Sequence, residues 1–407
     1  MPKQAQQVKK RKVFYIPGYD PMLPRRYREL YRTEGGKQAA VSGYDLTLKG
    51  TQGKAQNYGW RVDTDIDGQK THTDFEFLLW SDIVQASMER SIAGSFWLLA
   101  RTAWAYISTG ALFRLMRLQK GPIIAALYPV VVLLGQLLLG LIAGYAVFAL
   151  VSSFTHWALG LIAGFAALSA VMMWFKSKDN KIYAYYLMHD YAFSAQFDGD
   201  IPPELVARMA AFADHIHAAL EPDVDEVLVV GHSSGAHLAV SILADLIRRL
   251  GVPKYGPKLG FLSLGHVVPM VSFLPKAWIL RKDLNYLCQR DELTWVDVTA
   301  PGDGCTFALC DPAAVSGVAP EGGHKWPLIF SAAFSQTLSP KYFASIKRKF
   351  FRVHFQYLCH FDRPRDYDYF QITGGPVTLE TRFQDRAPSP SVITRSVNKY
   401  TSQEEPK

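Results

Sequence analysis

A serine flanked by glycines is the residue in this sequence best placed to carry out chemistry. Residues 231–235 read Gly-His-Ser-Ser-Gly, with Ser233 at the centre. An apolar stretch, DEVLVV, precedes them and an amphipathic helical pattern follows, so the serine stands at a predicted strand-to-helix turn. Such a turn strains the central residue and presents its hydroxyl at the carboxyl end of the strand, where α/β sheets place their sites. We therefore predict Ser233 as a nucleophile; an idle serine in a tight turn is the alternative.

This segment resembles the nucleophile elbow of α/β-hydrolases, lipases and esterases especially. The resemblance covers residues 12–20 and about 205–360. It implies an α/β fold with a mostly parallel sheet, helices on both faces, and a triad in the chain order serine, acid, histidine. The alternation of strand and helix patterns after residue 225 independently favours a parallel sheet covered by helices, with strands expected over 225–230, 261–269 and 293–299 and a helix over 235–250. In the first half, strands are expected over 12–19 and in the segments YDLTLKG, NYGWRVDTDI and THTDFEFLLW, the last two joined by a turn at Asp67-Gly68.

The acid of such a triad is expected just after a later strand. The segment TWVDVTAPGDGCTF places Asp303 in a loop bounded by proline and glycine, after a strand predicted over residues 293–299. We choose Asp303 over Asp297, which lies within that strand, and over Asp311, which comes eight residues later. An aspartate before a glycine can also be a simple turn former.

The base should be a histidine that follows the acid, which leaves His324, His354 and His360. We choose His354, because its His-x-x-Tyr context resembles the stretch around the catalytic histidine of some lipases, and keep His360 as the alternative base. A histidine in an aromatic run is often a hydrogen-bonded core residue. His232 and His237 lie too close to the nucleophile in sequence to serve.

Two backbone N–H groups are expected to form the oxyanion hole. The residue after the nucleophile, Ser234, supplies one, and the loop after an early strand supplies the other through Tyr19. The loop sequence YIPGYDP resembles the His-Gly oxyanion loop of lipases but has Pro17 where histidine is common. Backbone donors do not depend on that side chain.

The implied reaction is acyl transfer through an acyl-enzyme, with neither a metal nor an organic cofactor. No phosphate-cradling or dinucleotide motif is present. The four cysteines lack the pairing typical of zinc sites, which favours free thiols in a reducing compartment.

An uncharged apolar block occupies residues 121–175. It contains two runs, about 122–150 and 158–175, that meet or approach the ~20 residues needed to cross a bilayer as helices. Glycines four residues apart, Gly140 with Gly144 and Gly160 with Gly164, would let two helices approach closely. We predict a transmembrane helical hairpin; two buried core helices of a soluble protein are the alternative.

The charge distribution predicts the orientation of this hairpin. Both outer flanks are basic and the connecting turn has no lysine or arginine, so both termini and the soluble domain are expected in the cytoplasm. The net charge of +8 favours an anionic membrane surface as partner, and no nucleic-acid motif accompanies it. The basic residues near the terminus and the block are Lys3, Lys9, Lys10, Arg11, Lys12, Arg114, Arg117, Lys120, Lys176, Lys178 and Lys181.

The chain divides by composition into six parts. An aromatic-rich stretch with interspersed arginines precedes the hairpin and is predicted to lie at a membrane interface, a buried globular helix being the alternative. The parts are a basic N-terminal segment (1–11), the first part of the hydrolase domain (12–92), the interfacial segment (93–120), the hairpin (121–176), the second part of the domain (177–383) and a polar, disordered tail (384–407).

Taken alone, the sequence predicts a two-pass membrane-anchored serine hydrolase that cleaves a lipid-like carboxylic ester. A catalytically silent hydrolase fold that acts as a membrane scaffold or binding protein is the alternative. Transport is disfavoured, because the block provides only two spans and no charged residue within them. The oligomeric state is left open.

Overall fold

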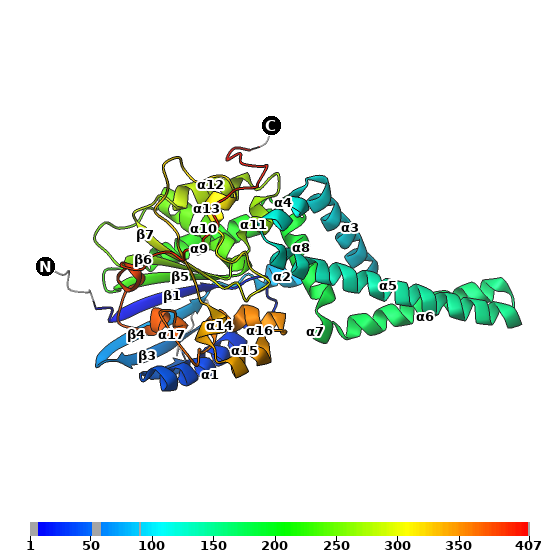
Figure 1. Cartoon of the computed structure of the whole chain (residues 1–407), viewed down its shortest axis with the longest axis horizontal. Helices are drawn as coiled ribbons and strands as arrows, with labels where there is room; N and C mark the ends of the chain where they lie inside the picture. Colours follow the sequence, from blue (N-terminus) through cyan, green and yellow to red (C-terminus); the bar gives the residue numbers. More distant parts are fainter. Residues whose placement is uncertain (1–6, 51–57, 89–90, 406–407) are drawn as a thin grey trace.

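The computed structural model describes residues 7–50, 58–88 and 91–405. They form an α/β domain around an eight-stranded mixed sheet, from which two long apolar helices project as a rod (Figure 1). The strand order is β2-β3-β4-β1-β5-β6-β7-β8; β4 and the strands beyond it are parallel, and β2, β3 and β4 are antiparallel. The strands are β1 (Lys10–Ile16), β2 (Asp45–Gly50), β3 (Gly59–Ile66), β4 (Gln69–Phe77), β5 (Glu226–His232), β6 (Lys258–Leu264), β7 (Leu293–Thr299) and β8 (Leu328–Ser331).

The predicted strands of the first half are present, with shifted ends. Asp67 and Gly68, the predicted turn between β3 and β4, both have positive φ values, as a tight hairpin turn requires. The strand predicted over residues 12–19 is β1, which begins at Lys10 and ends at Ile16. Its early end follows from Pro17, which has no N–H to donate to a neighbouring strand.

In the second half, β5, the following helix α10 (Ser234–Arg249) and β7 lie where the sequence predicted them. The strand predicted over residues 261–269 is partly wrong. It ends at Leu264, because Gly265 turns the chain with a φ of 54° and helix α11 (Val268–Ser272) begins immediately after. Strand β8, only four residues long, was not predicted.

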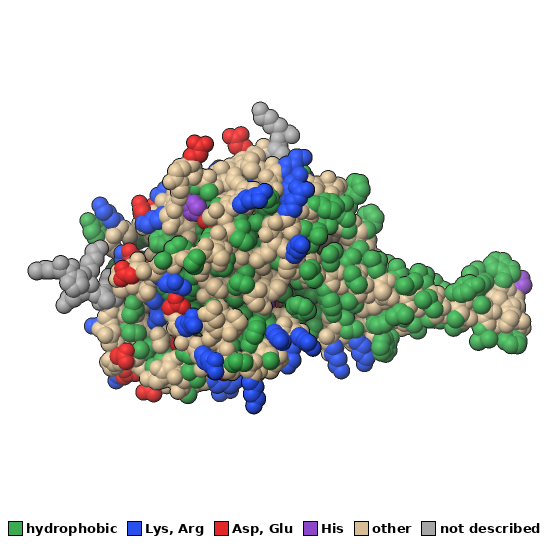
Figure 2. Space-filling model, in the orientation of Figure 1, with side chains coloured by type: hydrophobic (Ala, Val, Ile, Leu, Met, Phe, Trp, Pro, Cys, Tyr) green, Lys and Arg blue, Asp and Glu red, His purple; other side chains and the backbone are tan. Residues whose placement is uncertain are grey.

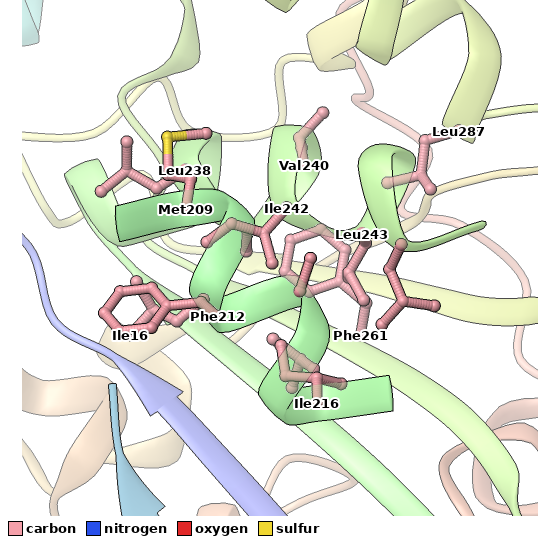
Figure 3. Close-up of a cluster of buried hydrophobic side chains, with 14 of the residues drawn as sticks. Ile16, Met209, Phe212, Ile216, Leu238, Val240, Ile242, Leu243, Phe261 and Leu287 are labelled. Atoms are coloured by element: carbon pink, nitrogen blue, oxygen red, sulfur yellow. The ribbon is translucent and has the colours of Figure 1, made fainter. Parts of the chain in front are cut away.

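Helices cover both faces of the sheet, each over its own apolar core. One face packs against α9, α10 and α12, and Figure 3 shows the side chains that interdigitate there, among them Phe212, Ile242 and Phe261. The other face packs against α1, α17 and the C-terminal helices. These helices are α1 (Pro24–Ser42), α2 (Ser81–Met88), α9 (Pro203–Ala218), α12 (Trp278–Leu287), α13 (Pro312–Val315), α14 (Phe334–Thr337), α15 (Pro340–Ile346), α16 (Phe350–His354), the 3₁₀ helix η1 (Phe355–Leu358), α17 (Tyr369–Gly374) and α18 (Leu379–Phe383).

The rod consists of α5 (Lys120–Phe154) and α6 (Trp157–Ser177), both long and apolar enough to cross a membrane. Only 22% and 17% of their most apolar windows are buried, so they are not core helices of the domain. Figure 2 shows hydrophobic side chains along the whole rod. The helices touch at their glycines: a Cβ at Gly144 would lie 2.9 Å from the Gly164 carbonyl oxygen. The predicted close approach through small residues is therefore present.

The segment before the rod forms α3 (Ile92–Ser108) and α4 (Ala111–Leu118). One side of α3 packs through Leu98 and Leu99 onto α8 (Ala184–Ala195), which follows the short α7 (Asp179–Ile182). Trp97 and Trp104 on its other side are about 70% exposed. The packed side of α3 therefore matches the alternative of a buried globular helix, and a membrane interface on the exposed side stays a prediction.

Two expectations for the chain ends require correction. The basic residues of β1 lie on the side of the domain away from the rod (Figure 1), and Arg11 is buried in an ion pair with Glu226 at 2.6 Å, so Arg11 does not face an anionic membrane surface as expected. Residues 1–6 lie outside the described chain. The described part of the tail is ordered rather than disordered: Ile393 exchanges backbone hydrogen bonds with Leu309 and Asp311, and Arg281 binds the Ser402 carbonyl. Complementary partners far away in sequence hold it, which a polar composition does not reveal.

Candidate active site

The loops that carry the predicted site residues meet at one edge of the sheet. β1, β5, β6 and β7 are parallel neighbours, so their carboxyl ends lie side by side. The loop with Gly18 and Tyr19 follows β1, Ser233 follows β5, and Asp303 follows β7. Parallel topology thus gathers residues that are hundreds of positions apart in the chain.

Ser233 adopts a strained conformation between β5 and α10. Its φ of 57° and ψ of −121° lie in a region that non-glycine residues rarely occupy, at a cost on the order of 1–3 kcal/mol. The Ser233 amide donates to the Leu264 carbonyl at 2.9 Å, which ties the turn to the neighbouring strand β6. The predicted elbow geometry is present.

Glycines make room for this turn. A Cβ at Gly235 would lie 2.1 Å from the Ile16 carbonyl oxygen, and one at Gly231 would lie 2.7 Å from the Gly235 carbonyl oxygen. On the facing loop, a Cβ at Gly18 would lie 3.0 Å from the Cβ of Ser233. The backbone after β1 therefore passes directly against the serine, which sequence spacing could not predict.

His354 and Asp303 form a buried pair. His354 Nδ1 lies 2.8 Å from Asp303 Oδ2, and the other carboxylate oxygen accepts the Cys305 amide at 3.0 Å. Both side chains are at most 10% exposed. An ionised Asp303 fixes the imidazole as the Nδ1–H tautomer. This leaves Nε2, which forms no hydrogen bond with the described residues, as the nitrogen able to take a proton.

The same pair lies beside the serine. His232 Nε2 donates to the His354 carbonyl at 3.0 Å, and the two rings are 4.8 Å apart. Burial, with the neighbouring His354, lowers the pKa of His232 to about 3, so this ring is neutral. Among the hydrogen bonds of the described residues, none joins Ser233 to His354; such bonds are often long in the absence of substrate.

The other histidines and aspartates considered for the triad have partners away from Ser233. His360 Nδ1 contacts Glu34 Oε2 at 2.6 Å and its ring stacks on Tyr342. His324 binds Asp311, which also caps α13. Buried Asp297 accepts from Ser263 and lies 3.8 Å from His266. Of these histidine–carboxylate pairs, only His354 with Asp303 reaches the cavity that contains Ser233.

The predicted oxyanion donors also border this cavity. The Ser234 amide belongs to the first residue of α10, so it has no acceptor within the helix. The Tyr19 loop is held firmly: its carbonyl accepts from the Tyr186 hydroxyl at 2.6 Å, and its own hydroxyl lies 2.6 Å from Ser87 Oγ. Gly18, next to Tyr19 in this loop, lies against Ser233, so both backbone segments border the serine, where the amides of an oxyanion hole are needed.

The cavity has a volume of about 690 Å³ and a mostly apolar lining. Part of its wall is the first half of α5, the helix that continues into the rod. Asp190, on α8, also lines it. Burial raises the pKa of Asp190 to about 7, while nearby His354 lowers it and Asp20 raises it. Neither α5 nor Asp190 was predicted as part of the site, since nothing local marks them.

Among the described residues, one group of side chains has the spacing of metal ligands. Asp303, Cys305 and His354 each place a ligand atom within 4.8 Å of the others. Asp303 and His354 already bind each other, and the second oxygen of Asp303 accepts a backbone amide. The arrangement is thus accounted for by a histidine–aspartate pair. All four cysteines are free thiols.

Comparisons with models of protein families, with curated proteins and with solved structures give no match. A function for this chain therefore has to be inferred from its own geometry.

Proposed function

We propose that this protein is a serine hydrolase of the α/β-hydrolase type, anchored in a membrane, that cleaves a lipid-like carboxylic ester. One observation carries the proposal. Ser233 has a strained backbone at the carboxyl edge of a parallel sheet and lines an apolar cavity together with His354. The Nδ1 of His354 is paired with the buried Asp303. A turn with a purely structural role does not need a strained serine, a histidine–aspartate pair and an apolar cavity in the same place.

The chemistry follows from the positions of these groups. Ser233 Oγ attacks the ester carbonyl carbon while His354 Nε2 takes the hydroxyl proton, and Asp303 stabilises the resulting imidazolium. The amides of Ser234 and Tyr19 stabilise the oxyanion. The intermediate collapses, the alcohol leaves with the proton from His354, and water then attacks the acyl-enzyme by the same route to release the acid and Ser233.

Membrane attachment is the second part of the proposal. An exposed apolar rod of two helices has no stable place in water. Basic residues stand at the domain ends of both helices: Lys120 at the start of α5, and Lys176 and Lys178 at the end of α6. The turn between the helices has no lysine or arginine, which favours a cytoplasmic domain. Protease added to sealed, right-side-out cells should then leave the domain intact; cleavage after Lys176 would overturn this orientation.

A fluorophosphonate probe on the full chain in detergent tests the catalytic part. The expected result is covalent labelling of the wild-type protein and none of Ser233→Ala, because the probe reacts with an activated serine hydroxyl. Equal labelling of both, or of neither, would overturn the proposal. The second outcome would favour a silent membrane scaffold.

A further inference from the structure

The two helices of the rod differ in length, and the excess lies at the active site. α5 has 35 residues and α6 has 21, a difference of about four helical turns. From the turn at residue 155 the helices run side by side, with Gly144 against Gly164. The unmatched turns are the start of α5, and they pack on the domain through Ile123 and Leu133.

These unmatched turns form a wall of the cavity. Ile124, Leu127, Tyr128 and Val131 line the same space as Ser233. Each is also at least 39% exposed, so this wall is open on one side. The helix that runs into the rod is therefore also a wall of the active site, and an apolar path connects the two.

The level of this opening relative to the rod is fixed by contacts. The Tyr128 hydroxyl donates to the Ile182 carbonyl at 2.8 Å, so this part of α5 lies beside α7, just past the end of α6. Lys176, Lys178 and Lys181 are at the same level, and Figure 2 shows lysine and arginine side chains clustered where the rod meets the domain. Basic residues at the end of an apolar span mark the headgroup layer of a bilayer.

Two cations line the cavity itself. Lys181 comes from α7 and Arg348 from the loop between α15 and α16. Both side chains are exposed, and neither forms an ion pair or hydrogen bond with the described residues. Asp20 and Asp190 are the carboxylates of the lining; Asp20 already accepts hydrogen bonds from the Met22 amide and the Tyr27 hydroxyl, and burial raises the pKa of both carboxyl groups. Lys181 and Arg348 are thus the cations of the lining that a headgroup can contact.

We propose that the cavity takes an anionic phospholipid from the adjoining leaflet, with the phosphate headgroup on Lys181 and Arg348 and an acyl ester at Ser233. This inference rests on the proposed hydrolase function and adds the substrate class. The acyl chains would follow the α5 wall, whose residues are apolar. A guanidinium and an ammonium are the groups that proteins use for phosphate.

Hydrolysis in neutral detergent micelles tests the proposal, because a neutral micelle removes recruitment by surface charge. The probes are phosphatidylglycerol and phosphatidylcholine with the same acyl chains. Wild type should prefer the anionic lipid in kcat/KM. Lys181→Ala with Arg348→Ala should reduce that preference on the order of tenfold or more, because each basic residue contributes roughly fivefold near an anionic lipid.

Lys178→Ala with Lys349→Ala is the matched control. It removes the same charge from exposed neighbours that do not line the cavity, so it should keep the preference. Equal rates of wild type on both lipids, or an equal loss in the control, would overturn the proposal. In either case Ser233-dependent ester cleavage would leave the proposed function standing.

Binding by Ser233→Ala separates the two proposals further. Fluorescent phosphatidylglycerol should bind this variant more tightly than the phosphatidylcholine probe, and the Lys181 and Arg348 substitutions should remove the difference even if no turnover is measurable. Equal binding of both lipids would count against the headgroup site. Displacement of the lipid by inorganic phosphate would indicate a site for a soluble anion and would also overturn the proposal.

Discussion

Two histidine–carboxylate pairs, whose histidines are six residues apart in the chain, have almost the same distance within the pair and different surroundings. His354 Nδ1 lies 2.8 Å from Asp303 Oδ2, and His360 Nδ1 lies 2.6 Å from Glu34 Oε2. His354 of the first pair lines the cavity with Ser233. The second joins the segment after η1 to helix α1, with Lys37 on the other oxygen of Glu34. The distance within a pair therefore does not identify a catalytic base. The position of the pair relative to a strained serine identifies it.

Substitution of the two histidines should give the largest difference between the pairs. His354→Ala should reduce ester turnover about as far as Ser233→Ala, by ~10⁶-fold if the groups act as one unit as in serine proteases. His360→Ala should keep most activity, since its ring contacts Glu34 and Tyr342 rather than the cavity. The measurement is kcat on a soluble ester.

The double variant Ser233→Ala with His354→Ala serves as the check. It should lose little more than either single variant, because residues of one catalytic unit are strongly non-additive. A fall in turnover with His360→Ala and not with His354→Ala would reverse the assignment of the base.

Substitution of the two carboxylates should give a similar but smaller difference in kcat. Asp303→Asn should lower kcat by ~10⁴-fold, less than loss of the serine, because an amide holds the imidazole in the wrong tautomer while the attack geometry persists. Glu34→Gln, the matched change in the other pair, should leave kcat within a few-fold of wild type. Comparable losses in both would mean that the Glu34 pair also shapes the cavity.

The contrast between the pairs also explains what could be predicted from sequence. The elbow at Ser233 depends on residues adjacent in the chain, so a local pattern was enough to find it. Asp303 and His354 were predicted from the chain order that the resemblance implies, and nothing in the sequence excludes His360. Its partner Glu34 is 326 positions away, and the two meet only because α1 packs over the C-terminal helices.

The same reasoning applies to the fold. Strands with clear apolar or alternating patterns were found, whereas β8, four residues long, carries too little pattern. The hairpin was evident from composition, but the packing of its first turns against the cavity depends on the unequal lengths of α5 and α6. The tail is ordered by distant partners such as Leu309, which a local composition does not encode.

The smallest expected effect concerns stability rather than activity. Burial alone would raise the pKa of Glu34, but hydrogen bonds from His360, Lys37 and the His360 amide outweigh it and lower the pKa to about 2. A carboxyl group whose pKa is lower in the folded state stabilises the fold above its unfolded pKa, near 4.5, and loses that contribution as the pH falls towards 2. Glu34→Gln should therefore lower the free energy of unfolding by about 1–3 kcal/mol at pH 7.

Thermal unfolding in detergent tests this prediction across pH. Between pH 4.5 and 2 the gap in stability between the variant and wild type should narrow. A gap that stays constant over this range would mean that Glu34 acts through packing and not through its charge, and the two pairs would then differ in chemistry as well as in position.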